Sequence, residues 1–333
     1  MRLLIVKTSS MGDVVHALPM VADLAKWLPG VEVDWLVEPA FSSLPAQNPG
    51  VSTVHRLPWR RWRRSLLEPQ TWRAMAELQS ALRQRQYELV IDAQGLLKSA
   101  LWARRAGVPV AGYGLGSIRE PLASLLYRHR HEVARQMHAV QRCRRLAASV
   151  ARALGSQSAP GDRQPLDAPD FGLQTVGAYA HPGLPVPYSV LIPNASRVEK
   201  HWPEAAWQRL GDRLRGLGMP AVVLWGSAGE QAMAERIAEP CGAWVPPFLT
   251  VHEAAQLLAG AKLVVGLDTG LTHVAAALGR PVVGIYCDHE PGLTGITGAV
   301  ASASLGGKGK QPAEAEVWAA VEQVASAASQ AAI

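Results

Sequence analysis

Residues 264–286 read VVGLDTGLTHVAAALGRPVVGIY. Two apolar runs enclose a polar turn and a helix of small residues that Gly279 ends, which predicts a strand, a helix and a second strand of a parallel α/β unit. The first N–H groups of such a helix carry about half a positive charge and favour a phosphate. A nucleotide diphosphate is therefore one hypothesis for the ligand. The same pattern is also typical of an ordinary crossover whose polar turn residues only cap the helix.

The alternation of apolar strands and amphipathic helices continues through both halves of the chain. In the first half we expect strands at 2–7, 31–37, 51–57 and 88–93, with helices at 14–28, 70–85 and 96–106 and an Arg-rich helical stretch to about residue 154. In the second half we expect strands at 188–193, 220–225, 243–246, 262–267 and 281–286, with helices at 203–216, 229–238, 251–260, 270–278 and 314–328. This order predicts an α/β protein with mostly parallel sheets and ligands at the carboxyl ends of the strands.

The same pattern suggests the domain boundaries. Residues 1–160 and 188–311 carry the two alternating patterns, and the intervening segment 161–187, with scattered Gly, Pro and Asp, is typical of a linker. We expect a cleft in which the carboxyl ends of both sets of strands face each other. Residues 312–333 contain a C-terminal helix that we expect to pack back on the N-terminal domain.

Size and composition narrow the class of protein. With 333 residues, 48% of them hydrophobic, the chain can form a core in each domain. No apolar run approaches the roughly 20 residues that span a bilayer, and the opening MRLLIVK leads directly into a strand pattern rather than a signal peptide. Cys143, Cys241 and Cys287 are widely spaced and form no CxxC, which favours the reducing cytoplasm and argues against a zinc site.

Charge is distributed unevenly along the chain. Residues 1–154 carry 22 Lys and Arg against 11 Asp and Glu, whereas residues 155–333 carry 11 against 16. We therefore expect the first half to meet nucleic acid, an anionic membrane surface or a multiply charged acceptor. Its segment 56–64, RLPWRRWRR, combines guanidinium forks that suit phosphates with Trp side chains that suit lipid headgroups. A solvated basic loop is the alternative, and no DNA- or RNA-binding motif supports a nucleic-acid partner.

The loop after the first strand, residues 7–16, reads KTSSMGDVVH. It places a glycine, which permits close backbone approach, beside Asp13 at the start of a helix. Asp13 is either a helix cap, worth about 1 kcal/mol, or a general base that takes a proton from an attacking hydroxyl. The dinucleotide fingerprint Gly-x-Gly-x-x-Gly does not follow this strand.

Two loops of the second half also follow strands and precede helices. Residues 193–203, PNASRVEKHWP, contain Lys200, a candidate to neutralise a diphosphate. Residues 225–230, WGSAGE, contain Glu230, which is either a ligand for ribose hydroxyls or a first-turn carboxylate favoured by the helix dipole. No Asp-x-Asp occurs in the chain, so we expect donor binding without a metal or other cofactor.

Several segments of this chain carry a family resemblance. Segments 7–16, 200–203 (KHWP) and 266–273 (GLDTGLTH), with 119–125 (REPLASL) and 141–142 (QR), resemble the ADP-heptose:lipopolysaccharide heptosyltransferases of glycosyltransferase family 9. The resemblance runs over nearly the whole chain. It implies a GT-B fold of two Rossmann-like domains and an inverting transfer of L-glycero-D-manno-heptose from ADP-heptose to Kdo-lipid A. It also implies peripheral contact with the cytoplasmic face of the inner membrane, without an obligate protein partner.

The resemblance assigns roles residue by residue, with Asp13 as the catalytic base. The implied donor site contains Ser196, Lys200, Glu230, Asp268, Thr269, Gly270 and His273. The acceptor candidates, all from the basic half, are Ser10, Gly12, Arg60, Arg61, Arg63, Arg64, Lys98, Arg119, His138 and Arg142. Relatives often carry two threonines shortly before the lysine, where this chain has Ala195 and Ser196.

Two other functions stay open. One is a related transferase that adds a second heptose, or another nucleotide-sugar enzyme of the same fold, such as an epimerase. The other is a non-catalytic binder of polyanions or membrane surfaces, in which Asp13 is only a helix cap. Turnover with ADP-heptose separates this binder from an enzyme.

Overall fold

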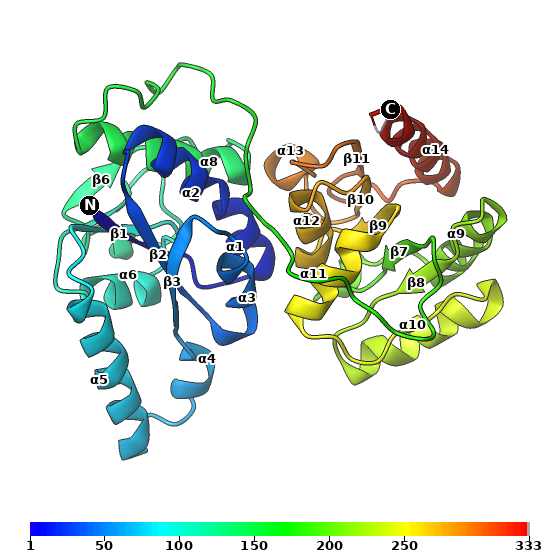
Figure 1. Ribbon diagram of the computed structural model, residues 1–333, viewed down its shortest axis with the longest axis horizontal. Helices are drawn as coiled ribbons and strands as arrows, with labels where there is room; N and C mark the ends of the chain where they lie inside the picture. The colour runs from blue at the N-terminus through cyan, green and yellow to red at the C-terminus, as the bar shows by residue number, and fades with distance from the viewer. Residues whose placement is uncertain (332–333) are drawn as a thin grey trace. The chain divides into compact units, whose positions relative to one another are not determined.

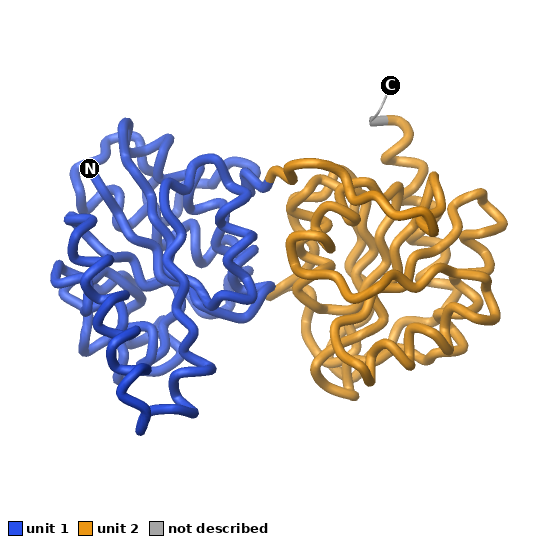
Figure 2. Tube along the Cα trace, turned by 60° about the horizontal axis from the view of Figure 1, so that its bottom comes forward, with its two compact units in different colours: residues 1–173 blue, residues 174–333 orange. Residues whose placement is uncertain are grey.

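The computed structural model describes residues 1–331, and its chain forms two compact units, Met1–Leu173 and Gln174–Ile333 (Figure 2). The division falls inside the segment predicted as a linker. Each unit contains one parallel sheet flanked by helices (Figure 1). The mixed α/β class and the two parallel sheets expected from the sequence are confirmed.

Unit 1 contains six parallel strands in the order β3-β2-β1-β4-β5-β6. The strands are β1 (Arg2–Val6), β2 (Glu32–Val37), β3 (Val51–Arg56), β4 (Leu89–Asp92), β5 (Val110–Tyr113) and β6 (His129–His131). This is the strand order of a Rossmann fold, in which the order reverses between β1 and β4. Ligands of such sheets bind beyond the carboxyl ends of the two strands at this switch point.

The helices of unit 1 cover both faces of the sheet. They are α1 (Met11–Ala17), α2 (Pro19–Trp27), α3 (Ser43–Ala46), α4 (Trp59–Trp62), α5 (Pro69–Gln84), α6 (Leu97–Arg104), α7 (Pro121–Ser124) and α8 (Ala139–Ala153), with a short 3-10 turn at Pro39–Phe41. In Figure 1, α2 and α8 lie on one side of the strands and α5 and α6 on the other. The four inner strands are therefore largely buried on both faces, and the apolar positions of β1 have no exposed surface, whereas the edge strands β3 and β6 are partly exposed.

Unit 2 contains five parallel strands in the order β11-β10-β9-β7-β8. The strands are β7 (Ser189–Ile192), β8 (Ala221–Val223), β9 (Leu263–Leu267), β10 (Val282–Tyr286) and β11 (Ser302–Gly306). The helices are α9 (Glu204–Gly216), α10 (Ala228–Cys241), α11 (Val251–Gly260), α12 (Gly270–Ala277), α13 (Pro291–Thr294) and α14 (Glu314–Ala331), with a 3-10 turn at Val198–Lys200. Counted within the unit, this is a flavodoxin-like order with its switch point between β7 and β9.

The C-terminal helix α14 contributes to the core of unit 2. Val317, Val321 and Val324 are buried in one cluster with side chains of the sheet and of α9 and α10. The sequence interpretation instead placed this helix on the N-terminal domain. The difference has a simple cause: the amphipathic pattern shows that α14 has an apolar face but not which sheet buries it.

Some expected elements differ from the observed ones. The helix expected at 14–28 is divided into α1 and α2 at Pro19, which has no N–H to donate to the preceding turn. The Arg-rich stretch before residue 154 contains β5, α7 and β6 in addition to helix α8. Strand β11 was not expected, and the segment 243–246 forms only an isolated bridge between Trp244 and Val222. Strands as short as β5 and β6 leave too few residues for a recognisable pattern.

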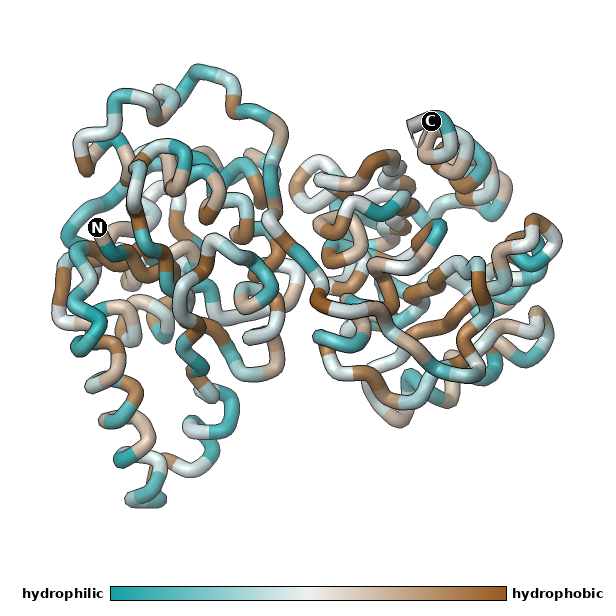
Figure 3. Tube along the Cα trace, in the orientation of Figure 1, coloured by the Kyte–Doolittle hydropathy of each residue, from teal (hydrophilic) through white to brown (hydrophobic). Residues whose placement is uncertain are grey.

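Hydropathy follows the layers of each unit. Figure 3 shows hydrophobic residues along the strands, whereas hydrophilic residues predominate on the outer helices and loops. Within residues 1–331, no helix combines the length and the apolar character that crossing a bilayer requires.

Candidate functional site

The candidate catalytic residue of unit 1 lies at the switch point of its sheet. Residues 7–10 leave the end of β1, and Asp13 lies in the first turn of α1. Its Oδ2 accepts hydrogen bonds from the backbone N–H of Ser10 at 2.9 Å and from the Ser10 hydroxyl at 3.1 Å. Asp13 therefore does stabilise the start of the helix, yet its side chain keeps 43% exposure and can contact a ligand. Ser10 and Gly12 flank it in the same turn.

Lys7 forms an ion pair with the Asp13 carboxylate. Its buried Nζ lies 3.4 Å from Asp13 Oδ1 and donates to the carbonyl of Ala93 at 2.9 Å. Burial by itself raises the pKa of Asp13, but the Lys7 charge, the Ser10 hydrogen bonds and the neighbouring His16 outweigh it and bring this pKa below the ordinary 3.8. The carboxylate is therefore ionised at neutral pH and ready to accept a proton.

The loop after β4 fixes the shape of the loop after β1. Gln94 Oε1 accepts from the backbone N–H of Thr8 at 2.8 Å and of Ser9 at 3.1 Å. Gln94 is held in turn by Asp92, whose carboxylate accepts from the Gln94 backbone N–H at 2.9 Å and from the hydroxyls of Tyr127 and Ser99 at 2.8 Å each. The two strands of the switch point thus position the Asp13 turn together.

Three further acceptor candidates, His138, Arg142 and Arg119, lie outside residues 56–64, which we call the arginine segment. His138 is the N-cap residue of α8 and accepts from the Val140 backbone N–H at 3.3 Å, and its ring lies 6.1 Å from that of His16. Arg142 donates to the Ser117 carbonyl at 2.7 Å, and its guanidinium lies 5.0 Å from the centre of the Tyr113 ring. Arg119 is exposed after β5. His138 and Arg142 therefore also have structural roles.

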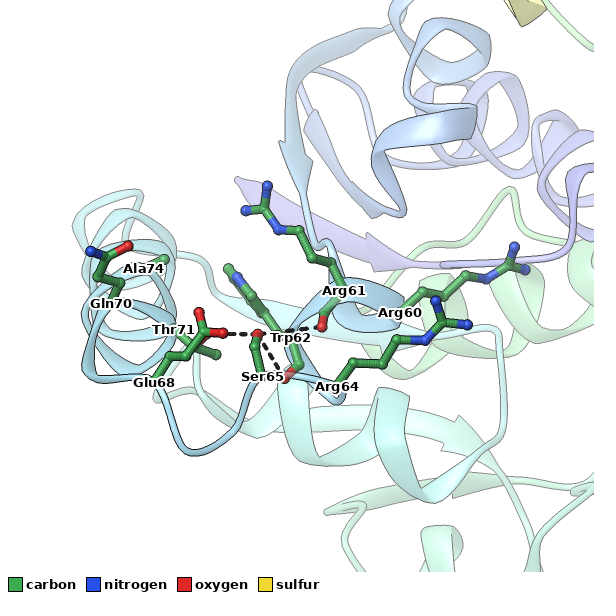
Figure 4. A pocket seen from close by; sticks show the side chains of 9 residues that line it. All are labelled: Arg60, Arg61, Trp62, Arg64, Ser65, Glu68, Gln70, Thr71 and Ala74. Carbon is green, nitrogen blue, oxygen red and sulfur yellow. Dashed lines mark hydrogen bonds between the residues drawn. The ribbon is translucent and has the colours of Figure 1, made fainter.

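The arginine segment forms a pocket between α4 and α5, of about 800 Å³. Arg60, Arg61 and Arg64 line it, with Ser65, Glu68, Gln70 and Thr71 on the connection to α5 and on α5 itself. Figure 4 shows Arg60, on α4, and Arg64, just after it, extending in the same direction, whereas Arg61 extends in another. The side chains of all four arginines, Arg63 included, belong to exposed residues.

The tryptophans of this segment are anchors rather than exposed side chains. The sequence analysis assigned these Trp side chains to a lipid headgroup interface, but Trp62 keeps only 4% exposure and packs on Trp102, with ring centres 5.5 Å apart. Trp59 is half-buried. An alternation of Trp and Arg along a short helix places the aromatic rings in the core and the guanidinium groups in solvent.

Glu38 connects the arginine segment to Lys98. Glu38 follows β2, is buried, and accepts from the backbone N–H of Arg60 at 3.1 Å. Burial raises the pKa of this carboxyl, and the charges of Arg60, Lys98 and Arg63 partly offset that rise. Lys98 therefore lies near the arginine segment, where it lines a largely apolar pocket.

The candidate donor site of unit 2 also lies at a switch point. Lys200, after β7, donates from Nζ to Asp268 Oδ2 at 2.6 Å and to the Asp268 carbonyl at 3.1 Å, after β9. The His273 ring approaches the other carboxylate oxygen at 3.4 Å. Burial raises the pKa of Asp268, but His273 and Lys200 hold it well below its usual range. The structure thus brings together Lys200, Asp268 and His273, three residues that the family resemblance places in the donor site.

The helix after this turn begins at the predicted position. Thr269 is the N-cap residue of α12 and Gly270 its first residue. Thr272 donates from its hydroxyl to the Leu267 carbonyl at 2.7 Å, and a Cβ at Gly266 would lie 2.3 Å from this hydroxyl oxygen. Glycine at 266 therefore allows the helix to approach the strand closely, with its N-terminus beside Lys200.

Glu230 and Ser196, the other donor-site candidates, do not contact the Lys200–Asp268 ion pair in any hydrogen bond of the described residues. Glu230 accepts from the Gly226 backbone N–H at 2.8 Å, so its carboxylate closes the loop after β8. This contact agrees with the capping alternative for Glu230. Ser196 is exposed in the loop after β7. Because β8, β7 and β9 are neighbours in the sheet, all three loops nevertheless emerge at adjacent strand ends.

Residues 1–331 contain no group of three or more His, Cys, Asp or Glu that could hold a metal ion. Cys143, Cys241 and Cys287 are free and buried. Metal-independent donor binding stays a prediction.

Three residues in these surroundings were not among the predicted site residues. They are Lys7, Gln94 and Glu38, and each directly follows a buried strand or lies two residues beyond one. A polar residue immediately after a buried parallel strand is the signal that would have identified them, because that is where ligand-facing loops begin.

Two Rossmann-like units with polar loops at their switch points are typical of GT-B glycosyltransferases, and comparisons with known proteins agree. The sequence profile of glycosyltransferase family 9 (heptosyltransferase) matches residues 75–318. Lipopolysaccharide heptosyltransferase 1 of Pseudomonas aeruginosa is 43% identical over 310 residues, which cover 90% of this chain and 82% of that protein.

Solved structures of a relative extend the comparison. The E. coli heptosyltransferase WaaC with ADP has a TM-score of 0.85 at 34% identity, covering 97% of this chain and all of that one. The same enzyme with ADP-2-deoxy-2-fluoro heptose has a TM-score of 0.79, covering 97% and 98%. The chain therefore belongs to glycosyltransferase family 9 and is a glycosyltransferase. The family and the GT-B fold expected from the sequence are confirmed.

We predict that Lys7→Met raises the pKa of Asp13. The substitution removes the charge that lowers this pKa and leaves the burial that raises it. The Asp13 carboxylate then loses its charge at a higher pH than in the unchanged protein. Carboxyl-carbon NMR titration of both proteins measures the shift, with Lys26→Met, an exposed lysine of the same unit, as the control. An unchanged Asp13 titration in Lys7→Met would show that Lys7 has no such role.

Proposed function

We propose that this enzyme transfers L-glycero-D-manno-heptose from ADP-heptose to Kdo-lipid A, as a heptosyltransferase I of lipopolysaccharide core synthesis, with inversion at the anomeric carbon. The ionised, partly exposed Asp13 at the switch point of unit 1 is the observation that carries this proposal. The relatives named as heptosyltransferase 1, and the relative solved with an ADP-heptose analogue, support the choice of donor and reaction.

In the proposed reaction Asp13 acts as the general base. As a Kdo hydroxyl attacks the anomeric carbon, its proton becomes acidic and passes to the Asp13 carboxylate. Lys7 lies beneath this carboxylate and keeps it ionised until the transfer. ADP leaves from the opposite face of the sugar, so one displacement inverts the configuration without a covalent sugar on the enzyme.

Unit 2 stabilises the charge on the departing diphosphate. Lys200 uses two of its three N–H groups on Asp268, which leaves one for a phosphate oxygen. The free backbone N–H groups at the start of α12 supply further donors and a partial positive charge. Glu230 and Ser196 complete the proposed donor site, where Glu230 accepts from the Gly226 N–H at Oε2 and has its Oε1 to accept from a ribose hydroxyl.

The acceptor is held by the basic side of unit 1. Kdo carboxylates and lipid A phosphates are closely spaced anions, and the arginine pocket presents guanidinium groups to them. Ser10, Gly12, Lys98, Arg119, His138 and Arg142 are the other proposed acceptor residues. The same cations favour peripheral contact with the anionic cytoplasmic face of the inner membrane.

Mass spectrometry of the product formed from ADP-heptose and Kdo-lipid A tests the proposed reaction. One added heptose on Kdo-lipid A is the expected result. Transfer only to an acceptor that already carries a heptose would instead identify a second-heptose transferase. Absence of transfer to either acceptor would contradict the proposal.

We predict that Asp13→Asn lowers turnover by about 10²–10⁴-fold and leaves ADP binding close to normal, because the lost base acts only in the transition state. A matched control is Glu253→Gln, since Glu253 accepts from Thr250 in the same helix-capping arrangement in α11. That variant should lose only the capping contribution and keep its turnover. If Asp13→Asn retains more than about a tenth of the rate with chemistry limiting, another group is the base.

We predict that ADP binding depends on Lys200 and not on a divalent ion. Lys200→Met should raise the Kd for ADP by about tenfold or more, as expected for the loss of a charge-assisted hydrogen bond. EDTA should leave the wild-type Kd unchanged. Calorimetry measures both, with Lys262→Met, an exposed lysine directly before β9, as the control. A large loss of affinity on chelation would reveal a metal site.

We predict that replacing Arg60, Arg61, Arg63 and Arg64 with Ser raises the KM for Kdo-lipid A, by up to about a hundredfold at low salt. Higher salt should shrink the difference, because it screens these contacts in the wild-type protein. The control replaces four other exposed arginines and removes the same charge: Arg73, Arg128, Arg163 and Arg213. An equal rise of KM in the control variant would show that only net charge matters.

A further inference from the structure

A second pocket of unit 1 shares the α4–α5 segment with the arginine pocket but has a different lining. It has a volume of about 440 Å³. Its walls come from α4, α5 and the segment between them on one side and from α6 on the other. The apolar lining residues are Trp59, Leu66, Trp72, Met75, Leu101 and Trp102.

This pocket exposes apolar surface to solvent. Leu66, Trp72 and Leu101 are 41%, 55% and 49% exposed, whereas Met75 and Trp102, at 5% and 1%, form its floor. Large apolar side chains gathered around a hollow are unfavourable in water and become favourable when an apolar ligand covers them. A hollow of this kind fits a narrow chain better than a flat protein surface.

The polar lining residues of this pocket are all cationic. Lys98, Arg104 and Arg105 line it, and no carboxylate is among its nine lining residues. The Arg105 guanidinium lies 4.5 Å from the centre of the Trp102 ring and so remains beside the apolar wall. An apolar hollow lined also by positive charge matches a molecule that joins a hydrocarbon chain to an anionic group.

The two pockets are neighbours through a pair of tilted rings in contact. Trp62 lines the arginine pocket and Trp102 the apolar one, and their ring centres are 5.5 Å apart. Residues of α5 alternate between the pockets, with Thr71 and Ala74 in the first and Trp72 and Met75 in the second. One amphiphile can therefore place its anionic head group and its chain on either side of this wall.

We propose that the apolar pocket binds an acyl chain of the lipid acceptor while the arginine pocket binds its anionic head group. The identity of the acceptor rests on the proposed function. The pocket then contributes apolar contacts beside the arginine pocket that a deacylated acceptor lacks. Its role differs from general adhesion to a membrane, because it is specific to a single chain.

A direct binding test uses the tryptophans that line the pocket. Lysophosphatidic acid with a dibrominated stearoyl chain, kept below its micelle concentration, should quench part of the tryptophan fluorescence saturably. In the double variant Leu66→Gln, Leu101→Gln the apparent Kd for this lipid should rise about tenfold or more. The control variant Leu217→Gln, Val300→Gln alters two comparably exposed apolar residues, 53% and 59% exposed, and should behave as wild type. Absent or non-saturable quenching, or an unchanged Kd in the pocket variant, overturns the proposal.

Kinetics with two acceptors provide the second test. The pocket variant should raise the KM for acylated Kdo-lipid A and leave the KM for its deacylated form unchanged. Equal effects on both acceptors overturn the acyl-chain proposal. So does loss of binding to phosphatidylglycerol vesicles with unchanged quenching by the single-chain lipid, which would assign the pocket to membrane docking. If the wild-type enzyme uses neither acceptor, the proposed function fails, whatever the quenching shows.

Discussion

The site loops of both units depend on one constraint of parallel sheets. At a switch point the two crossover helices leave for opposite faces of the sheet, so the carboxyl ends of the two central strands are not covered by their own connections. In unit 1 this point lies between β1 and β4, and in unit 2 between β7 and β9. Asp13 and Gln94 occupy the first, and Lys200 and Asp268 the second.

At each switch point an ion pair orients the important side chain. Lys7 lies beside Asp13 in unit 1, and Asp268 lies beside Lys200 in unit 2. In both pairs the partner is largely buried, at 8% and 12% side-chain exposure, and holds the residue that we propose meets substrate. Buried pairs of this kind cost desolvation and add little net stability, so their value here lies in orientation and in keeping a carboxylate ionised. This arrangement favours a site that is formed before the ligand arrives.

The sequence predicted most of the fold and the polar centre of each site, for reasons that the structure makes clear. Residues 264–286 form β9, α12 and β10 nearly as expected, because fully buried strands and a glycine-ended helix leave a strong local pattern. The family resemblance placed Lys200 and Asp268 in one site, and the structure adds their direct contact, which the sequence analysis did not predict. The packing of distant elements against each other was harder to predict from the sequence. The amphipathic pattern of α14 does not indicate which of the two sheets its apolar face covers. Nothing in the local sequence around Trp62 indicates that its ring packs on Trp102.

The uneven charge of the chain indicates how the two proposed substrates are bound. The first 154 residues are strongly basic, whereas the rest are net acidic, and yet the proposed anionic donor binds in the acidic part. At physiological salt, screening confines the effect of a charge to distances of about 8–10 Å. Close to a bound diphosphate, the positive charges of Lys200 and of the start of α12 therefore outweigh the net negative charge of this part of the chain. The acceptor is different, because it presents several anions to exposed arginines over a wide surface. Long-range attraction therefore favours encounter with the acceptor, and short-range geometry favours the donor.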